Sequence, residues 1–212
     1  MVNKLIFGGI WLAFSIYAFI FAPPNQPDTL DLILNLSTGN IQDINPLIVA
    51  LFNLMGVLPA IYACLVLVDG KGQKLPAGIF VATSFGVGAF ALLPYFALRK
   101  KNTTWSGEKS LLIKIVESRI TGIILTIATL SLIFFGFTYG NWSDFVAQWH
   151  NNRFINVMSL DFCLLCLLFP AIIKDDLPKR GIHNPAIFAI ISFIPLLGTL
   201  FYLCFRPKLI ED

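Results

Sequence analysis

Asp161 is the residue of this chain best placed to do chemistry, because it is the only formal charge well inside a long apolar stretch. A carboxylate near the centre of a bilayer costs ~2.5–3.5 kcal/mol on insertion scales, so such a group normally faces the bundle interior and has a partner. Two interpretations are open. Asp161 is either a hydrogen-bonded residue that locks helices together or a pigment, lipid or proton site.

The partner of Asp161 must come from another helix, because its neighbours on the same helical face are apolar. The polar candidates are Asn53, Tyr62, Tyr95 and Thr121. In the second interpretation, a carboxyl in an apolar pocket is suited to acid–base work on a polyene or an epoxide.

Other reactive residue types are less well placed. Cys163 and Cys166 have CxxC spacing, but they lie in an apolar helix without a nearby His, which favours packing. His150 and His183 fall outside the apolar stretches, so we do not expect them to ligate chlorophyll magnesium. The sequence contains no P-loop, metalloprotease or serine-hydrolase pattern.

Glu117 and Arg119 stand at the start of the fourth apolar stretch. They cannot pair with each other, because residues two apart do not share a helix face. Each could instead reach Asp161 or the charged loop 174–180. Structural pairing at the membrane interface is the favoured interpretation.

Composition and apolar periodicity indicate how these residues are positioned. Hydrophobic residues make up 57% of the chain and charged residues 13%, against ~25% charged in soluble proteins. The apolar runs are long and continuous, which favours helices over barrel strands. The sequence therefore predicts an all-α, polytopic transmembrane helical bundle of about six spans, forming one domain over 1–212. The expected spans, each long enough to cross a bilayer, are Leu5–Ala22, Pro46–Val68, Ala77–Leu98, Ile120–Tyr139, Phe154–Ile173 and Pro185–Phe205.

Three further expectations concern these spans. The first is expected to be a retained helix rather than a cleaved signal peptide, because its apolar run is too long and lacks a small-residue cleavage site. Gly88 and Pro94 predict a local kink in the third. Residues 110–119 are expected to continue helically into the fourth.

Two loops are candidate docking surfaces for a protein partner. The loop 23–45 is acidic, contains no Lys or Arg, and includes a short amphipathic helix from Thr29; we expect it to be external or interfacial. The loop 140–153 is rich in aromatic residues, as an interfacial belt would be. The contact candidates in these loops are Trp142, Trp149, Asp28, Asp31 and Asp43.

The basic residues bear on orientation and on nucleic-acid binding. With six spans, the positive-inside rule narrowly favours cytoplasmic loops at 99–119 and 174–184 and external termini, although the acidic first loop argues the other way. The basic stretch from Arg99 flanks a membrane helix, where anionic lipid is a simpler partner than nucleic acid.

Three stretches, residues 45–56, 84–95 and 154–170, resemble a little-characterised family of integral membrane proteins of cyanobacteria and plastids. The chain is also more distantly similar to the family of the plant membrane protein required for neoxanthin formation. That likeness rests on a span that runs into Leu93-Pro-Tyr and on a later helix with an intramembrane Asp, here Asp161. A His that precedes this Asp in the family is absent here, where Asn156 and its neighbours stand, and the first span is extra.

The resemblance implies a thylakoid protein of an oxygenic phototroph. The first expectation is a non-catalytic accessory protein that assembles or stabilises a photosynthetic complex, with the bilayer and photosystem subunits as partners and carotenoid or chlorophyll as the candidate cofactor. The alternative is a membrane enzyme that acts on a carotenoid or other lipophilic isoprenoid, with Asp161 as acid or base. A transporter has less support, because no inverted repeat of broken helices is evident.

Overall fold

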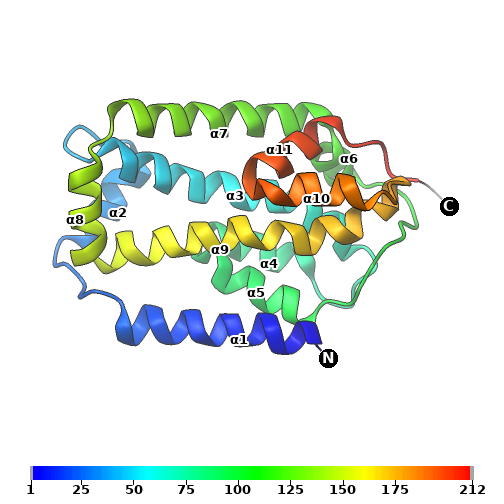
Figure 1. Ribbon diagram of the computed structural model, residues 1–212, viewed down its shortest axis with the longest axis horizontal. Helices are drawn as coiled ribbons and strands as arrows, with labels where there is room; N and C mark the ends of the chain where they lie inside the picture. The colour runs from blue at the N-terminus through cyan, green and yellow to red at the C-terminus, as the bar shows by residue number, and fades with distance from the viewer. Residues whose placement is uncertain (1, 211–212) are drawn as a thin grey trace.

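The computed structural model describes residues 2–210, and all regular structure in that part of the chain is helical. Long helices lie side by side, with α1 along one edge of the bundle, α7 along the opposite edge, and both chain ends directed to the same end of the molecule (Figure 1). The elements are α1 (Val2–Ile16), its π-helical continuation η1 (Tyr17–Phe21), α2 (Thr29–Thr38), α3 (Pro46–Gly70), α4 (Ala77–Val87), α5 (Ala89–Leu98), α6 (Leu111–Glu117), α7 (Arg119–Tyr139), α8 (Trp142–Asn151), α9 (Arg153–Asp176), η2 (Pro178–Arg180), α10 (Pro185–Phe193) and α11 (Pro195–Phe205).

Four of the six expected spans are long apolar helices. By length and composition they are Val2–Phe21, Pro46–Gly70, Arg119–Tyr139 and Arg153–Asp176. The outer helices α1 and α7 expose most of their apolar side chains, whereas α3 buries more than half of its residues. This pattern fits a bundle whose rim faces lipid tails and whose centre is α3. The helical membrane-bundle class is thus supported, and the count of six spans is not.

The third expected span is a hairpin of two short helices. The chain reverses at Gly88, whose φ of 50° and ψ of −124° suit glycine, and α4 and α5 return to the same end. The rings of Phe80 and Tyr95, near the first and last turns of the hairpin, are 5.6 Å apart. A helix of 10 or 11 residues is about 15 Å long, half of a hydrocarbon core. The expected kink is therefore a complete reversal.

The sixth expected span is also a hairpin, broken at Ile194 and Pro195 between α10 and α11. Proline supplies no backbone N–H and begins α11 at its first turn, where none is needed. The two helices cross closely at Gly198, where a β-carbon would overlap the backbone of Ile191. Both hairpins enter the bundle from the end that carries the chain termini (Figure 1).

The two hairpins place nearly all positive charge at one end of the bundle. This basic end comprises the start of α1, the loops 71–76, 99–110 and 177–184, and residues 206–210. Hydrogen bonds join its segments: Gln73 donates to the Lys100 carbonyl at 2.6 Å, and Lys179 lies 3.3 Å from Asp69. Of the 15 lysines and arginines, all within the described residues, only Arg153 lies at the opposite end. The sequence-based assignment of termini and basic loops to opposite faces was wrong, because it counted each hairpin as a crossing.

The opposite, acidic end consists of the loop 22–45 and α8. The expected amphipathic helix is present as α2; Asp28 precedes it but makes no side-chain cap. The expected loop 140–153 is largely the helix α8, which runs across the ends of the spans (Figure 1). The expected continuous helix into the fourth span is instead broken at Ser118, whose side chain caps the first turn of α7 by accepting a hydrogen bond from the Ile120 N–H at 3.2 Å.

The order of helices repeats once along the chain, so that two similar units can be distinguished. Each unit is a long helix, a short helix at the acidic end, a second long helix and a re-entrant hairpin: α1–α5 and α7–α11, joined by α6. The side chains at the hairpin bases repeat as well. Tyr95 donates to Asp69 at 2.6 Å, and Tyr202 donates to Asp176 at 2.6 Å, with a separation of 26 residues in each pair. Because both hairpins enter from one end, the repeat is parallel rather than inverted.

Candidate functional site

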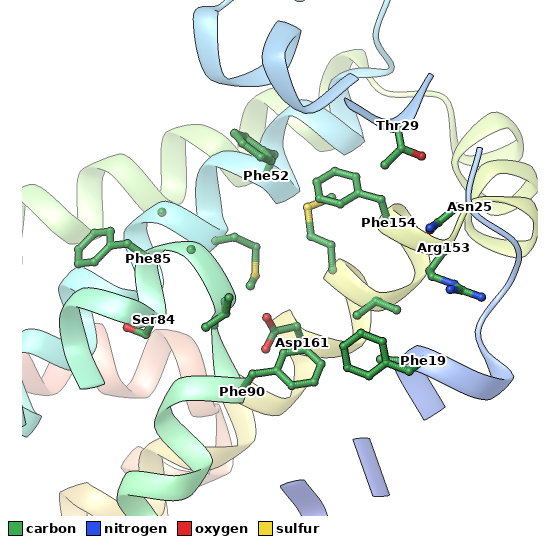
Figure 2. Close-up of a pocket in the computed structure, with 18 residues that line it drawn as sticks. Phe19, Asn25, Thr29, Phe52, Ser84, Phe85, Phe90, Arg153, Phe154 and Asp161 are labelled. Carbon is green, nitrogen blue, oxygen red and sulfur yellow. The ribbon is translucent and has the colours of Figure 1, made fainter. Parts of the chain in front are cut away.

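The two units pack differently, and a cavity lies at one of the places where they differ. Helix α7 packs along α3, but its counterpart α1 stands away from α9 over much of its length, leaving a cavity of about 740 Å³. Figure 2 shows the cavity bounded by the end of α1, the start of the loop after it, α3, the tip of the α4–α5 hairpin and α9. Its lining residues are Ala18, Phe19, Asn25, Thr29, Phe52, Met55, Gly56, Ser84–Gly88, Phe90, Arg153, Phe154, Val157, Met158 and Asp161.

Asp161 lies in this cavity wall and is only 6% exposed. Its Oδ1 accepts a hydrogen bond of 2.7 Å from the backbone N–H of Ala89, the first residue of α5. The first N–H groups of a helix have no intrahelical acceptor, and the helix dipole favours negative charge there. Within residues 2–210, Oδ2 has no hydrogen-bond partner. One carboxylate oxygen therefore holds the hairpin tip, and the other remains available to a ligand.

None of the four side chains expected to pair with Asp161 does so. Their hydroxyl and amide groups are used elsewhere: Asn53 donates to the Val49 carbonyl, Tyr62 to the Leu165 carbonyl, Tyr95 to Asp69 and Thr121 to the Ile115 carbonyl. The partner is a backbone N–H that becomes available only because the helix is broken at Gly88. The kink signal at Gly88 was the one sequence feature that pointed to it.

Aromatic rings form much of the cavity wall. Phe90 stacks on Phe14 with ring centroids 4.5 Å apart and lies 6.3 Å from the ring of Phe19, while Phe52 and Phe154 lie 6.3 Å apart on the opposite wall. Figure 2 shows the rings of Phe19, Phe90, Phe52 and Phe154 around the same space as the carboxylate. Phenylalanine offers flat apolar surface without a polar atom, which suits a flat or conjugated apolar ligand.

The position of Phe90 follows from Pro94 four residues later. Proline has no N–H to donate to the Phe90 carbonyl, and Trp11 of α1 donates to that carbonyl instead, at 3.0 Å. This bond attaches α1 to α5 beside the cavity.

The cavity has a polar mouth at the acidic end. Arg153, in the first turn of α9, donates through Nε to the Pro23 carbonyl at 2.8 Å and so holds the segment after α1 against α9. Asn25 and Thr29 line the same region. Arg153 and Asp161 are eight residues apart on α9, or about 12 Å. The cavity therefore combines a polar rim, an apolar aromatic middle and a single carboxylate at its inner end.

The cavity is open toward the side of the bundle. Phe19 of η1 and Phe85 of the α4–α5 hairpin line it and are themselves 74% and 54% exposed. Since α1 belongs to a candidate span with exposed apolar side chains, this opening lies where lipid tails are expected.

The docking candidates lie at the acidic end, outside the cavity lining. Trp142 is exposed, and its ring makes edge contacts with Phe137 and Phe145. Trp149 is half-buried in the small core beneath α2 and α8, so much of its ring is used in internal packing. Asp28, Asp31 and Asp43 are exposed.

A buried charge cluster at the basic end was not expected from the sequence. Asp69 accepts hydrogen bonds from Arg99 Nε and Nη2 at 2.8 and 2.6 Å, and Arg99 also pairs with Asp175 at 2.7 Å. Asp176 pairs with Arg180 at 2.8 Å. These residues fasten the bases of both hairpins to the ends of α3 and α9. No local sequence pattern predicts this cluster, because Asp69, Arg99 and Asp175 lie far apart along the chain.

Glu117 follows one of its two expected alternatives. Its Oε1 accepts from the Leu209 N–H at 2.7 Å and lies 3.4 Å from Arg180, and its Oε2 lies 3.0 Å from Lys109. Burial alone would raise the pKa of Glu117, but these donors outweigh it and hold the pKa below its ordinary value. Arg119 is exposed. Neither residue approaches Asp161.

The described residues hold no other constellation with evident chemistry. All four cysteines are free, and within residues 2–210 no group of three or more His, Cys, Asp or Glu side chains could hold a metal ion. Comparison of the chain with protein-family models, curated proteins and solved structures finds no match. The resemblances described from the sequence therefore stay predictions.

Proposed function

We propose that this membrane protein binds a lipophilic molecule of isoprenoid type, such as a carotenoid, in the cavity beside α1, and that Asp161 receives the polar end of that molecule. The observation that carries the proposal is a carboxylate in an aromatic cavity of about 740 Å³. One of its oxygens accepts from the hairpin tip, and the other has no hydrogen-bond partner among residues 2–210. Ligand sites are typically apolar clefts of ~300–1,000 Å³ with a few placed polar groups.

Asp161 is suited to more than binding. A carboxyl at the inner end of an apolar cavity can donate a proton to, or accept one from, a hydroxyl or epoxide oxygen of the ligand. An enzyme acting on a lipophilic isoprenoid, with Asp161 as acid or base, is therefore the catalytic form of the same proposal. Catalysis would convert the bound isoprenoid into a different product, whereas simple binding would leave it unchanged.

The test is to purify the tagged protein in mild detergent, extract the eluate with organic solvent and identify pigments and lipids by mass spectrometry. We expect one isoprenoid in fixed proportion to protein. Gly86→Leu should remove it, because Gly86 lines the cavity and a side chain there meets open space rather than protein. Gly78→Leu is the matched control, because Gly78 lies on the same helix with equally open space but outside the cavity lining.

Asp161→Asn separates the two forms of the proposal. The amide oxygen can still accept from Ala89, but the side chain can no longer exchange a proton. Retained ligand with an altered isoprenoid profile in the cells indicates catalysis; retained ligand with an unchanged profile indicates binding alone. Equal ligand content in the Gly86→Leu and Gly78→Leu proteins would refute a role for this cavity.

An accessory role in a photosynthetic membrane complex is the second candidate. The observation in its favour is that α8 has no buried residue and exposes Trp142 beside an acidic loop. Co-purification of photosystem subunits that is lost in Trp142→Ala and kept in Gly86→Leu would support it. A thylakoid location belongs to this candidate and is tested by fractionating the membranes of the source cell.

A further inference from the structure

A second concavity, of about 650 Å³, lies at the basic end, where the chain breaks between α6 and α7. It is separate from the aromatic cavity and shares no residue with it. Its lining carries five cationic side chains and one carboxylate: Lys109, Lys114, Arg119, Arg206, Lys208 and Glu117. This excess of positive charge needs an explanation, because like charges in one concavity repel one another.

The single carboxylate does not neutralise the positive charge of the pocket. Glu117 already accepts a hydrogen bond from the Leu209 N–H and pairs with Lys109 and Arg180. Within residues 2–210, no ion pair reaches Lys114, Arg119 or Lys208. These three cations are therefore available to an anion from outside the chain.

Arg206 is a second, independent indication. It is 3% exposed, and its terminal nitrogens donate to the carbonyls of Cys64 and Val116 at 3.0 and 2.7 Å. Its Nε has no hydrogen-bond partner among the described residues. A buried guanidinium N–H without an acceptor is costly. Arg206 also lines the pocket, so its positive charge adds to the attraction for an anion there.

The first turn of α7 borders this pocket. Ser118 and Arg119 line it at the start of a 21-residue helix, whose dipole favours an anion. A phosphate is the anion that best matches a helix N-terminus together with Arg and Lys side chains.

The surroundings of the pocket indicate where that phosphate comes from. Helix α6 exposes Leu111, Leu112 and Ile115, and the first turn of α7 exposes Ile120. Because α7 is a candidate span that begins at Arg119, the pocket lies at the level where a helix enters the hydrocarbon. Exposed apolar side chains next to a cationic pocket at that level are what a lipid with an anionic headgroup requires.

We propose that this pocket binds the phosphate of an anionic membrane lipid, whose acyl chains lie against the apolar side chains of α6 and the first turn of α7. This site does not depend on the aromatic cavity or on its ligand.

The test compares lipid retention by matched charge variants. The full-length protein is reconstituted in nanodiscs that contain phosphatidylglycerol and phosphatidylcholine in equal parts, then extracted and examined by native mass spectrometry. The pocket variant replaces Lys114, Arg119 and Lys208 with Gln. The control variant replaces Lys74, Lys101 and Lys174 with Gln, which removes the same charge from the same end outside the pocket.

We expect the wild type and the control to retain one phosphatidylglycerol, and the pocket variant to retain it about tenfold less or worse, since each juxtamembrane cation contributes severalfold to anionic lipid binding. Equal losses in both variants would overturn the proposal in favour of diffuse surface attraction. Displacement of the lipid by millimolar inorganic phosphate would also overturn it, in favour of a soluble phosphate ligand.

Thermal melting of the wild-type protein with added lipid tests the same proposal without a variant. Phosphatidylglycerol should raise the melting temperature of the detergent-solubilised wild type more than phosphatidylcholine does, with saturation near one lipid per protein. An equal effect of the two lipids would contradict the proposal.

Discussion

The carboxylate of Asp161 occupies the space that a side chain at Gly88 would need. A β-carbon built on Gly88 would overlap both carboxylate oxygens, and the φ of Gly88 is one that other residues rarely adopt. The hairpin tip can therefore approach α9 closely enough for the Ala89 N–H to reach Asp161. The contact between Gly88 and Asp161 therefore lies at the reversal of the α4–α5 hairpin, at the start of α5 and at the inner end of the cavity.

Gly88→Ala should destabilise the protein by at least about 1–3 kcal/mol, the usual cost of forcing a residue into a disfavoured backbone conformation, with the steric overlap added. Gly86→Ala is the matched control, since a β-carbon at Gly86 meets nothing within 4 Å. Thermal melting in detergent checks this prediction. Equal melting temperatures for the two variants would mean that the tip can shift away from α9.

Substitutions at Asp161 should separate hydrogen bonding from charge. Asp161→Asn keeps an acceptor for the Ala89 N–H, whereas Asp161→Leu leaves that buried donor unpaired, at a cost of about 1–3 kcal/mol. We expect the Leu variant to melt at a clearly lower temperature than the Asn variant. The opposite order would show that the interaction with Ala89 contributes little to the fold.

Asp69→Asn should strongly destabilise the bundle. Asp69 is fully buried and accepts from Tyr95 and Arg99 while pairing with Lys179. Loss of its charge leaves two buried cations undercompensated, which typically costs about 3–5 kcal/mol. Expression level and melting temperature report the loss.

The repeat supplies a second variant for that experiment. Asp176→Asn should behave similarly, because Asp176 pairs with Tyr202 and Arg180 at the base of the other hairpin. Asp43→Asn, at an exposed position of the acidic loop, should change stability by about 0.5 kcal/mol or less. A mild effect at Asp69 or Asp176 would refute the view that these pairs hold the hairpins.

Glu117 should contribute a pH-dependent increment of stability. Its pKa is lowered in the folded protein, so the increment is fully present above the unfolded-state pKa of about 4.5 and is lost as the pH falls through the folded-state pKa. The difference in melting temperature between wild type and Glu117→Gln should therefore be largest at pH 6–7 and shrink below about pH 4.5. The exposed Glu108 provides the control Glu108→Gln; a pH-independent difference at Glu117 would contradict its ion pairing.

The basic end should face the cytoplasm, because positively charged loops are retained on that side during insertion. Cysteines introduced at exposed positions in a background without the native four test this. Asn40→Cys, at the acidic end, should react with a membrane-impermeant maleimide in intact cells, and Lys101→Cys should react only after permeabilisation. The reverse pattern would show that the positive-inside rule fails for this chain.

The sequence alone indicated a helical membrane bundle and one central residue. Long apolar runs with 13% charged residues cannot build a water-soluble surface, and only helices satisfy their own backbone groups in lipid. The isolated carboxylate at Asp161 marked the interior of the bundle because an unpaired charge is expensive there. Local spacing also excluded a pair between Glu117 and Arg119 and left the loop at 174–180 as one of two alternatives for Glu117.

Tertiary structure decided which apolar stretches form one long helix and which form a hairpin of two short helices. About 20 apolar residues can lie in the hydrocarbon core either as one spanning helix or as two half-length helices, because most backbone N–H and C=O groups are hydrogen-bonded within the helices in both forms. The choice depends on whether distant groups satisfy a break in the middle. At Gly88, Asp161 of another helix accepts a hydrogen bond from the freed Ala89 N–H. At the hairpin bases, Asp69 pairs with Arg99 and Asp176 lies 3.8 Å from Arg206, each about 30 residues away along the chain. The cavity and the separation of basic and acidic ends follow from those long-range contacts, which no local pattern in the sequence contains.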